Sequence, residues 1–202
     1  MKKIPSPSKH RLIILAHILS QIKKNKVTSV ELGSLTGWNE ASIRRDISLL
    51  ELHNGVSNGY DTTLLREEIY KSLKIETNQK KRCCIVGLGN LGESLLENSI
   101  FEDSSFELVA GFDTNMNKIE IMKSNIPLYP TLDLEQKIRF LKIEYAILSV
   151  TDEKAQFMAD RLVSYGIKGI VNYTNVILTL PKEIKVKNVN TALILTEMAA
   201  DR

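Results

Sequence analysis

The apolar residues near the start of the chain recur at intervals of three and four, which is the period of an α-helix. The shared face of this helix consists of Leu12, Leu15, Ala16, Leu19 and Ile22. Because the polar run 23–26 follows directly, the pattern predicts a first helix that ends near Lys23.

Two shorter helices are predicted next from local capping signals. Thr28 is followed three residues later by Glu31, the spacing of a capping box, and Gly37 suits the left-handed residue that ends a helix. Asn39 then caps a third helix. Its apolar face is formed by Ile43, Ile47 and Leu50, and another face carries Ser42, Arg45, Asp46 and Leu49. Two short helices joined by a tight turn indicate a helix-turn-helix, although a plain helical bundle with solvated arginines would give the same pattern.

Turn dipeptides after the third helix favour the DNA-binding interpretation. Asn54-Gly55 and Asn58-Gly59 are typical of hairpin turns and predict a β wing. A further helix begins at Asp61 or Thr62, and the polar stretch 74–82 suits a linker. The predicted apolar face of this helix is Leu64, Leu65, Ile69 and Leu73. The N-terminal part is therefore predicted to be a winged helix.

The remaining sequence alternates between strand-like and helix-like segments. Strands are expected at 83–86, 106–112, 145–150, 169–173 and 184–189, with a short extended piece at 126–129. Helices are expected at 115–122, at 131–141 or 133–141, at 153–164 and at 193–200. Such alternation is typical of a parallel sheet with crossover helices. We predict an α/β protein with a winged helix-turn-helix domain at 1–78, a Rossmann-type parallel-sheet domain at 79–188 and a C-terminal dimerisation helix at 189–202.

Three spaced glycines follow the first of these strands. Gly87 permits a sharp turn, Gly89 lets the backbone approach a pyrophosphate, and Gly92 lets the next helix pack closely. Asp113 ends the next strand, where an acid bonds the adenine-ribose hydroxyls and repels a 2′-phosphate. The spacing predicts a site for NAD(H) rather than NADP(H), although Lys118 lies nearby. Glycines that only shape the turn are the alternative.

Composition and charge narrow the function. The chain has 202 residues, of which 43% are hydrophobic and 25% charged, as is ordinary for a globular protein. Residues 1–80 hold 13 basic and 8 acidic side chains, whereas residues 81–202 hold 14 and 16, so the first part is the candidate for a polyanion partner. All three histidines precede the linker, which argues against a dehydrogenase with a histidine base. No catalytic or metal site is predicted.

Two further patterns concern the compartment and the cysteines. The chain shows no signal peptide and no membrane span, so a cytoplasmic location is expected. Cys83 and Cys84 are adjacent in a strand and point to opposite faces, so we expect small core residues rather than a disulfide.

Several motifs carry a resemblance to a known family. They are Ile4-Pro5, Arg11-Leu12, residues 43–48, Asn58-Gly59-Tyr60, residues 86–92, Phe112-Asp113, residues 146–150, 159–163, 166–173 and 186–189. In this order they resemble the Rex redox-sensing transcriptional repressors, in which a winged helix precedes a Rossmann domain that reads the NADH/NAD balance.

The resemblance implies a homodimer that binds a palindromic operator when NAD dominates and releases it when NADH closes the dimer. It also implies that the C-terminal helix reaches across to the partner, the alternative being that this helix docks on its own sheet. The expected cofactor site is Gly87, Leu88, Gly89, Asn90, Leu91, Gly92, Asp113, Thr114, Lys118, Val150, Thr151 and Asn172. The expected DNA contacts are Lys9, Arg11, Ser29, Ser42, Arg44, Arg45 and Tyr60.

The chain departs from the family at the switch. The family has an arginine, a tyrosine and an acid where this chain has His17, Asn98 and Asn190, and those groups are thought to exchange partners between redox states. The segment 49–53 and the wing residues 57–58 also differ, which affects the expected operator preference. These departures leave three alternatives open: a regulator with impaired redox discrimination, a binder of CoA or another adenine nucleotide, and a Rossmann domain that only supports dimerisation.

Overall fold

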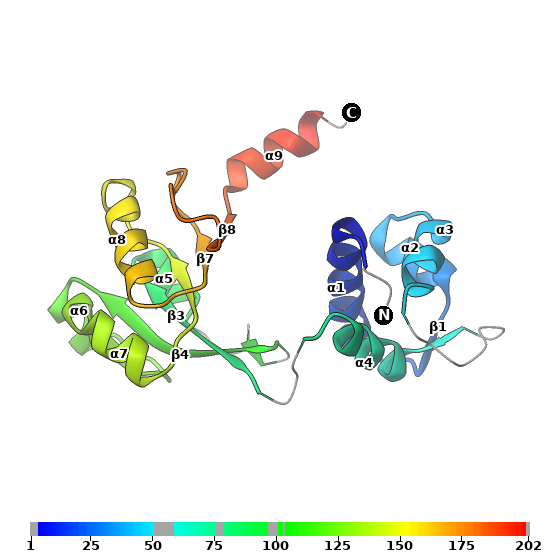
Figure 1. Ribbon diagram of the computed structural model, residues 1–202, viewed down its shortest axis with the longest axis horizontal. Helices are drawn as coiled ribbons and strands as arrows, with labels where there is room; N and C mark the ends of the chain where they lie inside the picture. The colour runs from blue at the N-terminus through cyan, green and yellow to red at the C-terminus, as the bar shows by residue number, and fades with distance from the viewer. Residues whose placement is uncertain (1–3, 51–58, 76–78, 97–100, 103, 201–202) are drawn as a thin grey trace. The chain divides into compact units, whose positions relative to one another are not determined.

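The computed structural model describes residues 4–50, 59–75, 79–96, 101–102 and 104–200. The chain divides into two compact units, Met1–Gln79 and Lys80–Arg202, which Figure 1 colours from blue to cyan-green and from green to red. Each unit has a hydrophobic core of its own, and each is described separately below.

The first unit is a small helical domain with one short sheet. Its elements are α1 (Ser6–Gln21), β1 (Lys26–Val27), α2 (Ser29–Thr36), α3 (Glu40–Ile47), β2 (Tyr60–Asp61) and α4 (Thr62–Ser72). Helix α1 packs against α4, and α2 packs against α3. The apolar face predicted for α1 is buried, since Leu12, Leu15 and Ala16 are fully covered.

The capping signals define the two helices of the helix-turn-helix as predicted. Thr28 Oγ1 accepts a hydrogen bond from the Glu31 amide, and the Glu31 carboxylate accepts one from the Thr28 amide, which completes the capping box. Gly37 has φ of 72°, in the left-handed region, and ends α2. Asn39 Oδ1 accepts from the Ala41 amide and starts α3. The turn between α2 and α3 is therefore encoded by adjacent residues.

One expectation for this unit is wrong: Leu64, predicted on the apolar face of α4, is 52% exposed. Asp46, on a different face of α3 from Ile43 and Ile47, is buried at 1% exposure. The predicted wing dipeptides at 54–55 and Asn58 lie outside the described residues. What the structure shows next to that segment is an antiparallel pair in which β2 bonds β1.

The second unit is a six-stranded parallel sheet covered by helices. Its strands are β3 (Lys81–Val86), β4 (Phe106–Asp113), β5 (Leu128–Pro130), β6 (Tyr145–Leu148), β7 (Gly169–Asn172) and β8 (Lys185–Asn188). Their spatial order is β5-β4-β3-β6-β7-β8, the strand order of dinucleotide-binding domains. The predicted Rossmann-type α/β fold is confirmed. Because β3 already begins at Lys81, the expectation that Arg82 belongs to the linker is wrong.

The described helices of this unit connect its strands or, in the case of α9, follow the last strand. They are α5 (Asn90–Ser94), α6 (Met116–Ile121), the 3-10 turn η2 (Thr131–Asp133), α7 (Leu134–Phe140), α8 (Asp152–Ser164) and α9 (Thr191–Ala200). The strand order reverses between β3 and β6, so the crevice at their carboxyl ends is where a ligand of such a sheet binds.

The two cysteines lie on opposite faces of the sheet, as expected. Cys83 belongs to the core cluster on one face and Cys84 to the cluster on the other. Burial raises the pKa of the Cys83 thiol to about 12 and raises the pKa of Cys84 further. Both thiols therefore stay protonated near neutral pH.

The terminal helix α9 follows β8 and projects away from the sheet of its own unit (Figure 1). Leu193, Ile194, Leu195 and Met198 are between 47% and 66% exposed, so α9 does not dock on its own sheet. Among the described helices, none combines the length and the apolar character that crossing a bilayer requires.

Candidate functional site

The glycine turn after β3 is built by contacts that admit no side chain. Gly87 has φ of 94°, and a Cβ there would lie 2.5 Å from the Ser149 carbonyl oxygen. A Cβ on Gly92 would lie 2.0 Å from the Gly87 carbonyl oxygen. At Gly89, by contrast, a Cβ would meet no protein atom within 4 Å. Gly87 and Gly92 therefore hold the turn together, while Gly89 leaves open the space in front of it.

Asp113 ties the end of β4 to the turn. Its Oδ2 accepts a hydrogen bond of 2.7 Å from the Leu88 amide, and its Oδ1 accepts one of 2.8 Å from the Asn115 amide. Each carboxylate oxygen has a second lone pair. The side chain is half-buried, so it can still accept hydrogen bonds from a ligand.

A pocket of ≈ 240 Å³ opens at the carboxyl ends of β3, β4 and β6. The residues that line it are Gly87, Gly89, Asp113, Thr114, Asn115, Lys118, Thr131, Ser149, Val150, Thr151, Lys154 and Met158. The structure thus gathers seven of the expected cofactor residues around one cavity: Gly87, Gly89, Asp113, Thr114, Lys118, Val150 and Thr151. Two lysines, Lys118 from α6 and Lys154 from α8, give the pocket cationic groups suited to an anionic ligand.

The other expected cofactor residues have different places. Leu88 belongs to the turn, and Asn90, Leu91 and Gly92 belong to the start of α5; none of them lines the pocket. Asn172 is fully buried, and its amide nitrogen donates to the Val176 carbonyl and to Asn188 Oδ1. It therefore organises the segment after β7.

Sequence patterns missed several lining residues, of which Ser149 matters most. Its hydroxyl donates to the Gly87 carbonyl at 2.7 Å and so joins the turn to the end of β6. Lys154 and Met158 lie one and two turns into α8, after Thr151. Lys154 follows Thr151 by three residues, and Met158 follows Lys154 by four. This helical spacing from a crevice residue is the signal that could have identified them.

The residues expected to contact DNA differ in their exposure and in their hydrogen bonds within the unit. Arg44 Nη1 donates to Ser29 Oγ at 3.1 Å and to Glu40 at 3.3 Å, so it links α3 to the start of α2. Arg45 is exposed, as is Lys9 on α1, whereas Ser42 and Tyr60 are half-buried. Among the described residues, Arg44 and Asp46 of α3 form ion pairs, and Arg45 forms none.

Arg11 has a structural partner. Its Nε and Nη2 donate to the two carboxylate oxygens of Asp46 at 2.5 and 2.9 Å, in a bidentate pair that joins α1 to α3. Burial works to raise the pKa of Asp46, but hydrogen bonding by Arg11 and Ser8 and the charges of Arg11 and Arg45 outweigh it, so the pKa is lowered. Asp46 is therefore a buried anion that holds α3 against α1.

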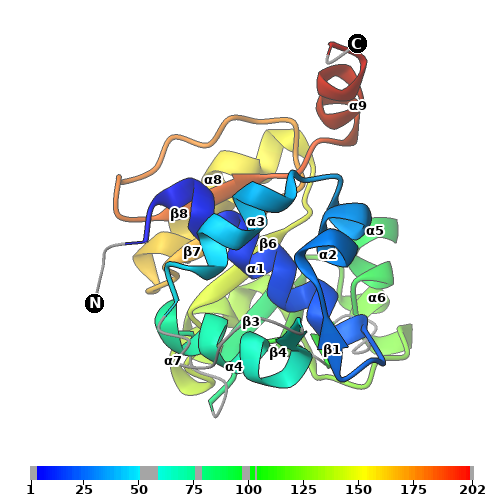
Figure 2. The same ribbon diagram turned by 90° about the vertical axis from the view of Figure 1, so that its right-hand side faces the viewer.

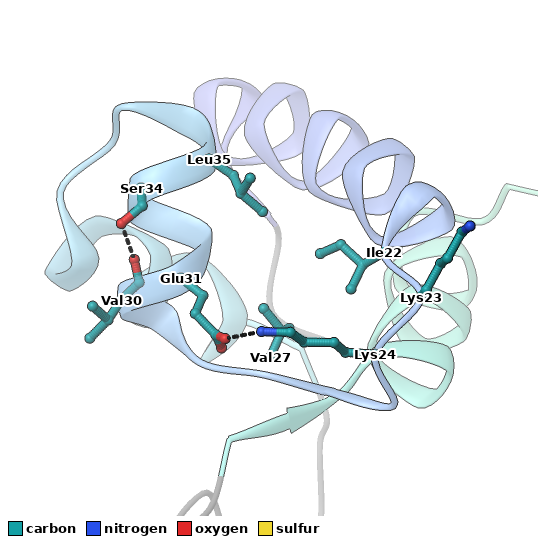
Figure 3. A pocket seen from close by; sticks show the side chains of 8 residues that line it. All are labelled: Ile22, Lys23, Lys24, Val27, Val30, Glu31, Ser34 and Leu35. Atoms are coloured by element: carbon teal, nitrogen blue, oxygen red, sulfur yellow. Dashed lines mark hydrogen bonds and ion pairs between the residues drawn. The ribbon is translucent and has the colours of Figure 1, made fainter.

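A second hollow lies in the first unit between the end of α1 and α2. Figure 3 shows Ile22, Val27 and Leu35 around it and the 3.0 Å ion pair of Lys24 with Glu31 across it. The pKa of Glu31 is lowered to about 2, first by the Thr28 amide, then by Lys24 and the Thr28 hydroxyl. Since Glu31 also completes the capping box, this ion pair reinforces the start of α2.

The switch positions form local contacts. Gln21 Nε2 and His17 Nε2 lie 3.1 Å apart in hydrogen-bond contact within α1. Asn190 Oδ1 accepts from the Leu193 amide at 3.0 Å and so caps α9, while Asn190 Nδ2 donates to Asn175 Oδ1. Asn98 lies outside the described residues.

Comparisons with known proteins agree with this arrangement. A family model described as "CoA binding domain" matches residues 78–176, and one described as "Putative DNA-binding protein N-terminus" matches residues 3–48. The chain is 35% identical over 192 residues to the redox-sensing transcriptional repressor Rex of Limosilactobacillus reuteri (strain DSM 20016), covering 94% of this chain and 89% of the relative.

Solved structures give the same picture. The chain is similar to the structure of RSP in complex with β-NADH, at a TM-score of 0.81 and 27% identity, covering 100% of this chain and 95% of the other. It is also similar to RSP in complex with β-NAD+ and operator DNA, at a TM-score of 0.84 and 26% identity, covering 100% and 93%.

Proposed function

The chain belongs to the Rex family of redox-sensing transcriptional repressors, and from this premise we propose that it binds NAD(H) in the pocket beside the glycine turn and operator DNA through α3. Its relatives repress transcription, so the dehydrogenase alternative is set aside. A DNA-bound repressor acts where the chromosome is, which supports a cytoplasmic location.

The observation that carries the proposal is the open space at Gly89, in the pocket that the carboxylate of Asp113 also lines. A pyrophosphate fits where a Cβ of residue 89 would otherwise stand, because that position meets no protein atom. Asp113 is held by the Leu88 and Asn115 amides and retains lone pairs for ribose hydroxyls. The nicotinamide supplies the redox information, since its ring is cationic in NAD+ and neutral in NADH. Residues 150 and 151 at the end of β6 would contact that half of the ligand.

The DNA-binding part of the proposal rests on α3 and its neighbours. Arg45 is exposed on α3, and an arginine there can fork onto a guanine or hold a phosphate. Arg44 donates a hydrogen bond to Ser29 at the start of α2, and Lys9 is exposed on α1. These residues, with Ser42 and Tyr60, are the proposed contacts.

A homodimer is the proposed assembly. The exposed apolar side chains of α9 would be a liability in water, and a second copy can cover them. Two-fold symmetry then calls for a palindromic operator. The mass in solution tests this point, because a monomer would contradict the operator model.

A second candidate function is a regulator with weakened redox discrimination. The observation that favours it is that Asn190, where the family has an acid, bonds Asn175 and the start of α9 within its own chain. A neutral amide engaged in this way cannot exchange ionic partners between redox states.

One titration separates these functions. Fluorescence titration with NADH, NAD+, NADPH and CoA, with and without operator DNA, should show tighter binding of NADH than of NADPH and a loss of operator affinity with NADH. Tighter binding of NADPH would reject the role of Asp113. Preference for CoA would support the adenine-nucleotide alternative, and equal effects of NADH and NAD+ would favour weakened discrimination.

Replacing Arg45 by Ala is expected to lower operator affinity by about 1–3 kcal/mol, because a base or phosphate contact is lost. The measurement is a gel-shift titration at fixed salt. Arg66→Ala on α4 is the matched control and should leave the affinity unchanged. If both variants bind like the wild type, Arg45 is not a DNA contact.

A further inference from the structure

The segment between β7 and β8 lies along α8 and is fastened to it. Figures 1 and 2 both show this connection running beside α8 before it returns to β8. Gln156 on α8 accepts from the Thr179 amide at 2.9 Å and donates to the Thr179 carbonyl at 3.0 Å. The position of this segment therefore follows the position of α8.

A chain of three polar side chains continues from the start of α8 to the start of α9. Asp152 Oδ1 accepts from the Asn175 amide at 3.0 Å, and Asp152 Oδ2 accepts from Asn175 Nδ2 at 3.2 Å. Asn175 Oδ1 accepts from Asn190 Nδ2 at 3.0 Å. Asn190 in turn caps α9 through the Leu193 amide. We refer to Asp152, Asn175 and Asn190 as the Asn175 relay.

The two ends of the relay lie at the two places that the proposed function depends on. Asp152 is preceded by Thr151 and followed by Lys154 within one turn, and both of these line the pocket. The Lys154 amide donates to the Thr151 carbonyl, so these residues move as one turn. At the other end, Asn190 caps the first turn of α9 by accepting from the Leu193 amide.

The energetics of the relay suit a contact that changes during regulation. Asp152 and Asn175 are exposed and Asn190 is half-buried, so water can replace each hydrogen bond at little net cost in free energy. By contrast, Asn172 beside it is fully buried and anchors the Asn188 side chain and the Val189 amide. The end of β8 is therefore fixed, while the start of α9 depends on contacts that exchange easily.

We propose that Asn175 is a positioning residue that couples occupancy of the nucleotide pocket to the orientation of α9. A ligand that contacts Thr151 and Lys154 favours one arrangement of the first turn of α8, and the relay passes this preference to α9. The inference rests on the proposed function, because it takes the pocket as the NAD(H) site and α9 as the dimer contact. It locates the coupling within one chain, through the side-chain amides of Asn175 and Asn190.

The test compares the ratio of operator affinity without and with saturating NADH in full-length variants. In Asn175→Ala, NADH affinity and operator affinity without nucleotide should stay within about twofold of the wild type, while the ratio should shrink by about fivefold, the equivalent of one exchanged hydrogen bond. Thr179→Ala is the control, because it lies in the same segment and bonds Gln156 through its backbone alone; its ratio should not change.

Exchanging the carboxylate and the amide between positions 152 and 175 tests whether the NADH response can be rescued. Asn175→Asp places two carboxylates in contact and should reduce the ratio at least as strongly as Asn175→Ala. The double variant Asp152→Asn with Asn175→Asp restores a donor–acceptor pair and should recover the ratio. If the wild type responds to NADH and Asn175→Ala responds equally, the relay is overturned and the proposed function stands. If the wild type itself shows no NADH response, the proposed function fails and the relay with it.

Discussion

Replacing Arg11 by Met should lower the free energy of unfolding of the first unit by about 3–5 kcal/mol, because it leaves the buried carboxylate of Asp46 without its partner. The Asp46 side chain is only 2% exposed, whereas that of Arg11 is 32% exposed. Loss of the arginine is therefore more costly than loss of the acid, since a freed guanidinium can reach water and a freed carboxylate cannot. Asp46→Asn should cost less, about 1–3 kcal/mol.

Trp38 allows this measurement to be made on the first unit alone. It is the one tryptophan of the sequence, and it packs against the core of α1, α2 and α3. Its fluorescence during urea unfolding should show a lower midpoint for Arg11→Met. Lys9→Met, an exposed change on the same helix, should shift the free energy by less than about 0.5 kcal/mol. Equal stabilities of Arg11→Met and Lys9→Met would contradict the role of the pair.

The stability that Arg11→Met loses should depend on pH, because the pair requires an ionised Asp46. The folded pKa of Asp46 is lowered, so the stabilisation by the pair is fully present above about pH 4, the ordinary range of an aspartate, and is lost as the pH falls through the lowered value. The deficit of Arg11→Met should accordingly be greatest near pH 7 and shrink in acid. A deficit that is constant with pH would point to lost packing of the arginine stem instead.

Salt dependence distinguishes a structural Arg11 from one that contacts a phosphate. If Arg11 acts by holding α3 against α1, the slope of operator affinity against salt should stay the same in Arg11→Met, although the affinity falls. A lost phosphate contact would reduce this slope by about one.

The parts of the fold that could be predicted are those with signals carried by neighbouring residues. The capping box of Thr28 and Glu31 and the left-handed Gly37 define α2 because each signal spans three or four positions. The strand before Gly87 and the acid at 113 follow from periodicity and spacing. Such signals place elements and identify a turn, but they do not say which side chains meet.

What could not be predicted depends on contacts between distant segments. Asp46 sits among polar residues on α3, and its burial as an anion depends on its bidentate partner Arg11, which lies 35 positions earlier. Ser149 bonds the Gly87 carbonyl across 62 positions. Asn172 is the last residue of β7, at the ligand edge of the sheet, yet its hydrogen bonds to Val176 and Asn188 turn its side chain inward. In each case the helical or strand pattern is correct and the partner comes from the tertiary fold.

The second large effect is expected at Gly92. A Cβ there would stand 2.0 Å from the Gly87 carbonyl oxygen and 3.1 Å from Ser149 Oγ, and the backbone atom cannot move aside without opening the turn. Gly92→Ala should therefore abolish measurable NADH binding. It should also destabilise the second unit by about 3 kcal/mol, the upper end of the usual cost of overpacking. NADH fluorescence titration and urea unfolding followed by circular dichroism measure the two effects.

Gly89→Ala is the matched variant that separates binding from folding. Gly89 has φ of −64°, which any residue can adopt, and its Cβ would meet no protein atom, so stability should change by less than about 0.5 kcal/mol. The added methyl group would instead occupy the space that the pyrophosphate is proposed to use, and NADH affinity should fall by at least about tenfold, or 1.4 kcal/mol. Operator binding without nucleotide should persist. A Gly89→Ala protein that binds NADH like the wild type would show that the ligand does not approach this turn, and the pocket would then need another occupant.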